Sequence, residues 1–577
     1  MNSLNRVSEE QIAQLVARGC MAQDWSEILV SDDFDAAQLF GVRMSGRVLI
    51  GRGARLSNVY ISNYEVGEGA LVEDVKRLEC RCESSFGNGV EVASVNENGG
   101  RSILIYNALS AQMAYMWTMY RHREEACRRM STMAESFARS RRSSMGHVGA
   151  GARVVGAGLI REVNICDGVV VEGASLVENV TLLAGCRVGV DVKLRDAIVA
   201  EDARVDTGAT LERVFVGECA VVASGFSAVD SLIFASSHLE NGEAVSIFAA
   251  PYTVSHHKST LLIAGLFSFF NAGSASNQSN HLFKRGAVHQ SIHPRGCKFA
   301  SGAYIMSPAC EGAFTMVKGY HAHHHDTTIF PYSYLVDDAK GRSVLMPGAN
   351  LASYGTCRDI AKWPQRDKRH LMRDHINYEE YNPYTTGMMV KALNALNALM
   401  ESDESADEYV WERVVIGKSH ARRGVGLYQK AIAASIGAML ERGAWSMECL
   451  TYSDWIDVAG AYVPQSYVTA MLDDLESGHI TDLSQIDGHF EMFAQRYDDY
   501  AHTWAYSLLS QLNGHPPTTE EVAQSIESAC KIAEGLDAMR QGDMRRDMSM
   551  QMAVGYGYDS LGDEETKRAD FHVVQGV

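Results

Sequence analysis

Three consecutive segments of 17 residues read REVNICDGVVVEGASLV (161–177), ENVTLLAGCRVGVDVKL (178–194) and RDAIVAEDARVDTGATL (195–211). Aliphatic residues recur six apart within each segment and five apart between segments, at Ile165, Val171, Val177, Leu182, Val188, Leu194, Val199, Val205 and Leu211. Small residues stand beside them at Gly156, Gly173, Gly189 and Gly208. A period of six fits neither a helix nor an isolated strand. It is typical of hexapeptide repeats, in which short strands wind into a parallel β-helix and small residues sit at the tight corners.

The repeat extends beyond these segments in both directions. The six- and five-residue spacing runs from Val148 to Ala228, and a related pattern at Ile50–Val59 recurs 16 residues later at Val66–Val75. Residues 103–142 lack the repeat and contain no Gly or Pro, which indicates a helical interruption. We therefore expect a mainly β protein: a left-handed parallel β-helix over 40–335 with a helical insertion at about 103–142.

The two ends of the sequence do not show the repeat. We expect a helical segment at 1–39 and a mainly helical region at 336–577 after the repeats stop. ESDESADE at 401–408 is typical of an acidic linker, and Thr518 with Glu521 forms a capping-box pattern. Aromatic residues at Phe490, Phe493 and Tyr497 follow a helical period, which favours a core or interface face over a cofactor site.

Composition limits the classes of function. No stretch of 18 apolar residues is present, and the acidic start MNSLNRVSEE does not resemble a signal peptide. Twelve scattered Cys suit a reducing compartment, so we expect a cytoplasmic protein. The net charge of −19 argues against nucleic-acid and membrane partners, which require a basic surface.

One segment departs from the acidic average. Residues 121–142 contain seven Arg and three Glu. The first interpretation is a solvated helix face with pairs such as Glu124–Arg128 and Glu125–Arg129. The alternative is a clamp for phosphate groups or for an acidic patch on a neighbouring subunit.

The candidate chemistry lies at 250–335, which holds nine of the 20 His. Residues one coil apart stack in a solenoid, so these polar side chains are expected to line one groove. The predicted catalytic residues are His281 and His289, followed by His256 and His257. The predicted substrate-binding residues are Lys258, Asn277, Gln278, Asn280, Lys284, Arg285, Gln290 and Lys298. The predicted metal ligands are His321, His323, His325 and Asp326 in the run HAHHHD.

Three functions remain open at this stage. In the first, a His acts as general base while a hydroxyl or amine attacks an acyl thioester, and nearby Lys and Arg hold phosphates. The substrates would then be an acyl-CoA and a sugar or nucleotide-sugar acceptor. In the second, three His bind a divalent metal that activates water, as in the hexapeptide-repeat carbonic anhydrases. In the third, the groove binds a ligand or serves assembly without catalysis.

The motifs NQSNH and AVHQ, with RGCKFASGAYI and HAHHHDTTIFPYSYLV, resemble a bacterial family of unknown function found mainly in Bacteroidetes and spirochaetes. WIDVAGAYVPQSYVTAMLDDLESGHI is similar to that family's C-terminal region. The repeats also resemble the trimeric left-handed β-helix superfamily of acyltransferases and sugar-nucleotide enzymes. That resemblance implies a homotrimer with active sites between subunits. The helical insertion and the helical C-terminal third depart from the usual acetyltransferases.

Overall fold

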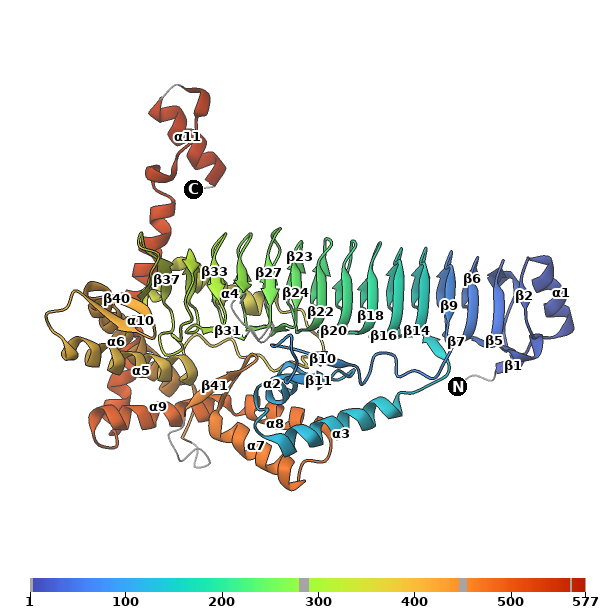
Figure 1. The fold of residues 1–577 in the computed structure, drawn as a ribbon, viewed down its shortest axis with the longest axis horizontal. Helices are drawn as coiled ribbons and strands as arrows, with labels where there is room; N and C mark the ends of the chain where they lie inside the picture. The colour runs from blue at the N-terminus through green and yellow to red at the C-terminus, as the bar shows by residue number, and fades with distance from the viewer. Residues whose placement is uncertain (1–3, 280–289, 446–453, 561–562, 576–577) are drawn as a thin grey trace.

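A parallel β-solenoid forms the long axis of the molecule in the computed structural model, which describes residues 4–279, 290–445, 454–560 and 563–575 (Figure 1). Its long strands are β14 (Leu159–Ile165), β16 (Leu176–Leu182), β18 (Lys193–Val199), β20 (Thr210–Val216) and β22 (Ser227–Ile233). Parallel pairing aligns Ile160 with Val177, Val177 with Leu194 and Leu194 with Leu211. The predicted 17-residue register is therefore confirmed.

The other solenoid strands, most of them shorter, complete the coils. They are β4 (Leu39–Phe40), β5 (Arg43–Ile50), β6 (Arg55–Ser57), β7 (Tyr60–Val66), β8 (Leu71–Glu73), β9 (Arg77–Glu79), β12 (Gly146–Val148), β13 (Arg153–Val155), β15 (Val170–Glu172), β17 (Arg187–Val188), β19 (Arg204–Val205), β21 (Val221–Ala223), β23 (His238–Glu240), β24 (Glu243–Val245), β25 (Phe248–Ala249), β26 (Val254–Ser255), β27 (Leu261–Ile263), β28 (Gly265–Phe267), β29 (Asn271–Ala272), β30 (Asn277–Ser279), β31 (Ser291–His293), β32 (Lys298–Phe299), β33 (Tyr304–Met306), β34 (Ala309–Cys310), β35 (Met316–Lys318), β36 (Tyr320–His321) and β37 (Tyr334–Asp337).

The backbone turns at the corners of the coils in two ways. Gly173 takes a positive φ of 71°, as expected at a tight turn. Gly189 does not, and it is needed for close packing instead: a Cβ there would lie 1.8 Å from Asp206 Oδ1. A second row of corners bends the long strands at residues that are not glycine, with φ of 53° at Asn179 and 51° at Asp196. Asn and Asp tolerate this left-handed region, and Asn179 Nδ2 donates to Asp196 Oδ1 at 2.6 Å.

The N-terminal end already belongs to the solenoid. Helix α1 (Glu9–Ala17) follows β1 (Leu4–Arg6), which pairs with β3 (Ile28–Ser31). Both β2 (Met21–Ala22) and β3 pair in parallel with β5, so the sheet begins before the expected boundary at residue 40.

The predicted interruption is present and is wider than expected. Strand β7 pairs directly with β12, with Tyr64 opposite Gly146, so the chain leaves the solenoid and returns to the adjacent coil. The insertion contains a hairpin, β10 (Glu91–Ala93) with β11 (Ser102–Leu104), and two helices, α2 (Ala111–Met119) and α3 (Glu124–Ser140).

An apolar row on the outside of the solenoid explains where the insertion packs. Ile198, Phe215 and Leu232 alternate with inward-facing residues along their strands and pair with one another across the coils. All three are fully buried, and hairpin strand β10 contacts β20 and β22. The Tyr115 ring of α2 meets Phe248 edge-on at 6.2 Å. Burial of this row holds the insertion on one side of the solenoid (Figure 1).

The C-terminal region is mainly helical, as predicted. It contains α4 (Tyr354–Arg366), α5 (Pro383–Ser402), α6 (Lys418–Arg442), α7 (Gln465–Ser477), α8 (Leu483–Gln495), α9 (Tyr497–Asn513), α10 (Thr519–Asp547) and α11 (Glu564–Gln575). Strands β38 (Ser343–Met346), β39 (Glu408–Trp411), β40 (Val414–Gly417), β41 (Trp455–Val458) and β42 (Ala461–Pro464) complete it. The Thr518–Glu521 capping box is formed at the start of α10.

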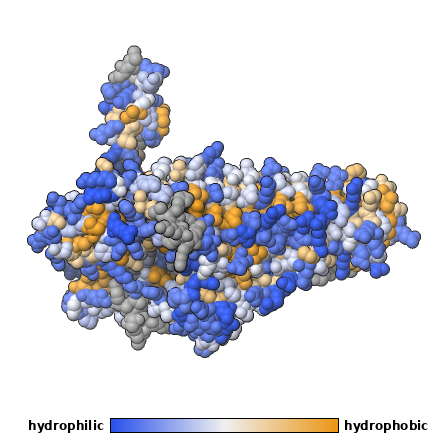
Figure 2. Space-filling model, viewed as in Figure 1, coloured by the Kyte–Doolittle hydropathy of each residue, from blue (hydrophilic) through white to orange (hydrophobic). Residues whose placement is uncertain are grey.

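Helices α7 and α8 lie beside the insertion and α9 packs against α6, whereas the end of α10 and α11 project from the body (Figure 1). The Arg-rich segment largely follows its first interpretation, since Glu125 pairs with Arg128 and Arg129. Arg123 instead pairs with Asp473 and Glu476 of α7, so it meets an acidic patch within the same chain. Hydrophilic residues cover much of the face in Figure 2, with apolar residues scattered among them. No helix in the described part of the chain is both long and apolar enough to cross a membrane.

Candidate functional site

Several polar residues of 290–325 lie inside the solenoid and not in an outer groove. Pairing across coils runs from Ile233 through Ala249 and Phe267 to His293, so His293 occupies a core position of the stack. His293 Nδ1 lies 2.6 Å from Glu311 Oε2, and His325 Nε2 lies 2.9 Å from Glu311 Oε1. His321 Nδ1 lies 2.8 Å from Ser343 Oγ. We call His293, Glu311, His321 and His325 the buried histidine cluster.

The electrostatics of this cluster follow from its burial. Burial alone would raise the pKa of the fully buried Glu311 carboxyl, but His293 and His325 outweigh it and lower that pKa to about 2. Burial would lower the pKa of His325, and Glu311 raises it above its ordinary value. Burial lowers the pKa of His321 to about 4, helped by the neighbouring His325. The cluster therefore keeps one carboxylate ionised inside the solenoid by pairing it with two imidazoles.

Aromatic rings pack around His293, and the rest of the cluster is also buried. The His293 ring lies 5.1 Å from Phe267 and 4.9 Å from Phe299, and none of the three side chains is appreciably exposed. The cluster thus ties together successive coils, and its enclosure favours a structural role over contact with a substrate.

The four predicted metal ligands do not converge. His321 and His325 are buried with ring centroids 6.2 Å apart, whereas His323 and Asp326 are exposed. Asp326 Oδ1 accepts hydrogen bonds from Thr328. Across the residues that the structure describes, no three His, Cys, Asp or Glu side chains form a metal-binding group. The run HAHHHD divides between the interior and the surface, which sequence spacing alone does not show.

The two preferred general bases, His281 and His289, lie outside the described residues, together with Asn280, Lys284 and Arg285. His256, His257 and Lys258 are exposed at the corner after β26. The His256 ring lies 4.4 Å from His257 and 6.2 Å from His238. We call these three histidines the histidine corner. Burial lowers the pKa of His256, and its two neighbours lower it further.

The remaining predicted binding residues are dispersed. Gln278 is fully buried, and its amide has no hydrogen-bond partner among the described residues; Asn277 precedes it on β30. Gln290 Oε1 accepts from Arg101 Nε at 3.1 Å and Nη2 at 2.9 Å. Lys298 forms an ion pair with Asp359. These contacts engage Gln290 and Lys298 within the protein.

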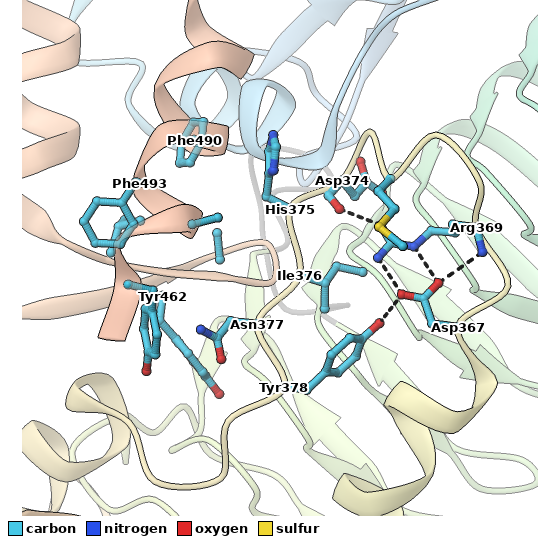
Figure 3. Close-up of a pocket in the computed structure, with 15 residues that line it drawn as sticks. Asp367, Arg369, Asp374, His375, Ile376, Asn377, Tyr378, Tyr462, Phe490 and Phe493 are labelled. Atoms are coloured by element: carbon cyan, nitrogen blue, oxygen red, sulfur yellow. Dashed lines mark hydrogen bonds and ion pairs between the residues drawn. The ribbon is translucent and has the colours of Figure 1, made fainter. Parts of the chain in front are cut away.

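A cavity that the sequence did not indicate lies between the solenoid and the helical region (Figure 3). Its volume is about 310 Å³. Phe490 and Phe493 of α8 and Tyr462 of β42 form one side, and the segment 367–378 forms the other. We call this cavity the aromatic pocket; its lining is Asp367, Arg369, Met372, Asp374, His375, Ile376, Asn377, Tyr378, Ala461, Tyr462, Val463, Phe490, Phe493, Ala494 and Tyr497.

The charged groups of the pocket already have partners within the protein. Arg369 donates to Asp367 from Nε at 2.9 Å and from Nη2 at 2.7 Å, and the Tyr378 hydroxyl donates to Asp367 at 2.7 Å. Asp374 accepts from the N–H groups of Ala111 and Ala235 at 2.7 and 3.0 Å, and burial raises its pKa. These contacts fix the segment 367–378 against the insertion and the solenoid.

Two other groups retain hydrogen-bonding capacity, although the His375 ring already makes a hydrogen bond to the backbone of Asp487. The His375 ring lies nearly parallel to Phe490, with centroids 6.4 Å apart, and burial lowers its pKa, so the imidazole is neutral at pH 7. The buried Tyr497 hydroxyl has no hydrogen-bond partner within the described parts of the chain. The pocket therefore combines aromatic walls with a neutral imidazole and an unsatisfied hydroxyl.

Arg295 holds the pocket together and was not singled out by the sequence. This fully buried guanidinium donates to Asp457 at 2.8 Å, to the Asn377 carbonyl at 2.6 Å and to the Gly460 carbonyl at 2.7 Å. It also lies 4.2 Å from the centroid of the Tyr462 ring. One side chain from the solenoid thus fixes both the 367–378 segment and the β41–β42 hairpin.

The fold and pocket define a class of protein: a parallel β-solenoid with an inserted helical arm and a helical C-terminal region packed against it. Residues 54–400 match a family described as a domain of unknown function, DUF4954, and the chain belongs to that family. Residues 446–577 match a second domain of unknown function, DUF6819. An uncharacterized protein of Treponema pallidum (strain Nichols) is 22% identical, over 88% of this chain and 82% of its own length. The aromatic pocket takes one wall from each matched region.

Proposed function

We propose that this protein binds a small, planar, uncharged aromatic or heteroaromatic molecule in the aromatic pocket. The observation that carries the proposal is the set of rings at Tyr462, Phe490 and Phe493 around a cavity of about 310 Å³. That volume falls at the lower end of the range for small-molecule sites, about 300–1,000 Å³. Aromatic rings attract a flat ligand through offset or edge-to-face contacts.

The polar groups of the pocket restrict the ligand further. Asp367 and Arg369 neutralise each other, so neither offers an unpaired charge to a ligand. His375 and the Tyr497 hydroxyl can exchange hydrogen bonds with ring nitrogen, amide or hydroxyl groups. A nucleobase or nucleoside has this combination of a flat ring and a hydrogen-bonding edge.

Ligand-induced thermal shifts of the full chain test the proposal. Ligands that bind the native state raise the melting temperature, so we expect stabilisation by members of a panel of nucleobases, nucleosides and aromatic amides. Ala494 is exposed at the edge of the pocket, and Ala494→Trp should block entry and abolish the shift. The matched control is Ala523→Trp at an exposed position of α10, which should retain the shift. A shift that survives in Ala494→Trp, or no shift with any compound, would refute the proposal.

A second candidate function is acyl transfer at the histidine corner. The observation that favours it is the lowered pKa of His256, which leaves the imidazole neutral and able to accept a proton near pH 7. An assay for thioester cleavage with acyl-CoA and nucleotide-sugar acceptors tests this function. His256→Gln should lose turnover, whereas His479→Gln, at an exposed histidine elsewhere, should not. His281→Ala and His289→Ala test the two bases that were favoured from the sequence.

The homotrimer belongs with this second function, because in the resembling superfamily the active sites lie between subunits. Light scattering of the purified chain measures its mass in solution. A trimer supports a shared site, and a monomer at micromolar concentration argues against it.

A further inference from the structure

A second cavity lies beside the helical insertion. It has a volume of about 570 Å³ and lies between α3 and the turn that begins α8. Helix α8 borders both cavities: its first turns contribute Leu483, Ser484 and Asp487 here, and its later turns contribute Phe490 and Phe493 to the aromatic pocket. The two sites are therefore distinct but share one helix.

Hydroxyl groups dominate the wall formed by α3. Thr132, Ser136 and Ser140 are spaced four residues apart, so they lie on one face of the helix. Thr132 Oγ donates to the Arg128 carbonyl at 3.0 Å and Ser140 Oγ to the Phe137 carbonyl at 2.6 Å. Their oxygen lone pairs remain able to accept hydrogen bonds. We call this second cavity the hydroxyl pocket.

Aromatic and acidic side chains complete the hydroxyl pocket. The rings of Tyr106 and Phe137 lie 5.4 Å apart. The Tyr106 hydroxyl is buried and has no hydrogen-bond partner among the described residues. Asp487 accepts from Ser110 Oγ at 2.5 Å. A buried hydroxyl without a partner is unfavourable, and a polar ligand within reach would remove that penalty.

The charge of the lining determines what kind of ligand fits. Asp482 and Asp487 are its charged residues, and no Lys or Arg is found among the described residues that line it. Asp482 already caps α8, accepting from the Ser484 N–H at 2.9 Å. Two guanidinium groups contact the lining without forming part of it: Arg139 Nη2 donates to Ser136 Oγ at 3.4 Å, and Arg141 lies 4.8 Å from the centroid of the Phe137 ring. The lining itself presents two carboxylates, so an uncharged ligand is favoured over a phosphate or carboxylate.

We propose that the hydroxyl pocket binds an uncharged carbohydrate. The half-buried Phe137 ring provides apolar surface for the C–H face of a sugar. The serine and threonine oxygens, the Tyr106 hydroxyl and Asp487 provide donors and acceptors for its hydroxyl groups. This site does not depend on the proposed function of the aromatic pocket.

Isothermal titration of the full chain with neutral mono- and disaccharides tests the inference. Ser136→Trp should fill the pocket and abolish binding, whereas Ser528→Trp, at an exposed position of α10, should not. Tyr106→Phe keeps the ring and removes one hydroxyl; it should weaken binding about tenfold, as expected for one lost hydrogen bond. Its melting temperature should not fall, because no residue in the described part of the chain bonds to this hydroxyl.

Specific outcomes would overturn the inference. These are no binding of any neutral sugar at millimolar concentration, undiminished binding by Ser136→Trp, or unchanged affinity in Tyr106→Phe. A sugar phosphate that binds as tightly as the neutral sugar would contradict the charge argument. Binding of a polyamine alone would identify the site as a cation site instead.

Discussion

The two halves of the solenoid place different side chains at the same stacked positions. In the first half one row of aligned residues reads Ile160, Val177, Leu194 and Leu211. Further along, the same kind of alignment joins Gln278, Ile305 and His321. Both groups are buried, yet one is purely aliphatic and the other is largely polar. The comparison shows that backbone pairing fixes the coil, while the interior accepts polar side chains as well as aliphatic ones, such as His321 beside Ser343.

The largest expected effect comes from placing a charge in the aliphatic half. Leu194 is fully buried between Val177 and Leu211, so Leu194→Asp should lower the free energy of unfolding by about 3–5 kcal/mol. Lys193→Asp, at the exposed neighbouring position, is the control and should change it little. Urea denaturation followed by circular dichroism measures both. Equal midpoints for the two variants would show that Leu194 does not face the interior.

Lowering the pH should destabilise the protein through the polar half of the solenoid. The pKa of His321 is lowered to about 4 from an unfolded value near 6.5, so between these values the unfolded chain binds more protons. Stability should therefore fall as the pH drops from 6.5 to 4, by up to about 3 kcal/mol. Glu311 adds a further loss as the pH falls from about 4.5 towards 2. Urea midpoints measured across this range should show a smaller slope in His321→Gln; an identical slope would exclude His321 as the cause.

Removing the buried carboxylate of Glu311 is expected to lower the free energy of unfolding by a smaller amount. Glu311→Gln keeps the shape of the side chain but removes the carboxylate that two imidazoles contact, and should destabilise by about 2 kcal/mol. Glu65→Gln removes the acid of an exposed pair with His147 and should change stability by less than about 1 kcal/mol. Thermal denaturation of both variants gives the comparison. If Glu311→Gln changes stability as little as Glu65→Gln does, the buried carboxylate and its two imidazoles contribute nothing to stability.

The smallest expected effect is an increase in stability, produced by a substitution in the aliphatic half of the solenoid. Thr207 is exposed and has a φ of 46°, a conformation that β-branched residues rarely adopt. Thr207→Gly should stabilise the protein by about 1 kcal/mol by relieving that strain. Thr210→Gly, at an exposed position in strand β20, should destabilise by about the same amount. If the two melting temperatures change in the same direction, the positive φ of Thr207 is not a source of strain.

The sequence predicts the fold where residues repeat and fails where contacts are long-range. The register of Ile160 and Val177 follows from spacing alone, because each coil contacts its neighbours. The repeat also located the interruption. Periodicity could not show that His293 and His321 point inward, since polar residues in a coil suggest exposure until their partners are known.

The candidate sites were harder still to foresee. Phe490 and Phe493 were recognised as an aromatic helix face, but the cavity beside them depends on a segment more than 100 residues earlier in the chain. Arg295 joins three separate segments and carries no local motif. Such sites arise from packing between elements, which no single stretch of sequence encodes.

The pairing of Tyr64 with Gly146 has a consequence for synthesis of the chain. A ribosome releases the first coils well before residues 146–148, so the edge of β7 next to β12 stays open during that interval. The insertion must emerge, and its ends must be brought together, before the next coil can dock on Val66. The stacking of new coils must therefore stop while the insertion is being synthesised. A truncated chain that ends within the insertion would present an unpaired strand edge, a known starting point for aggregation.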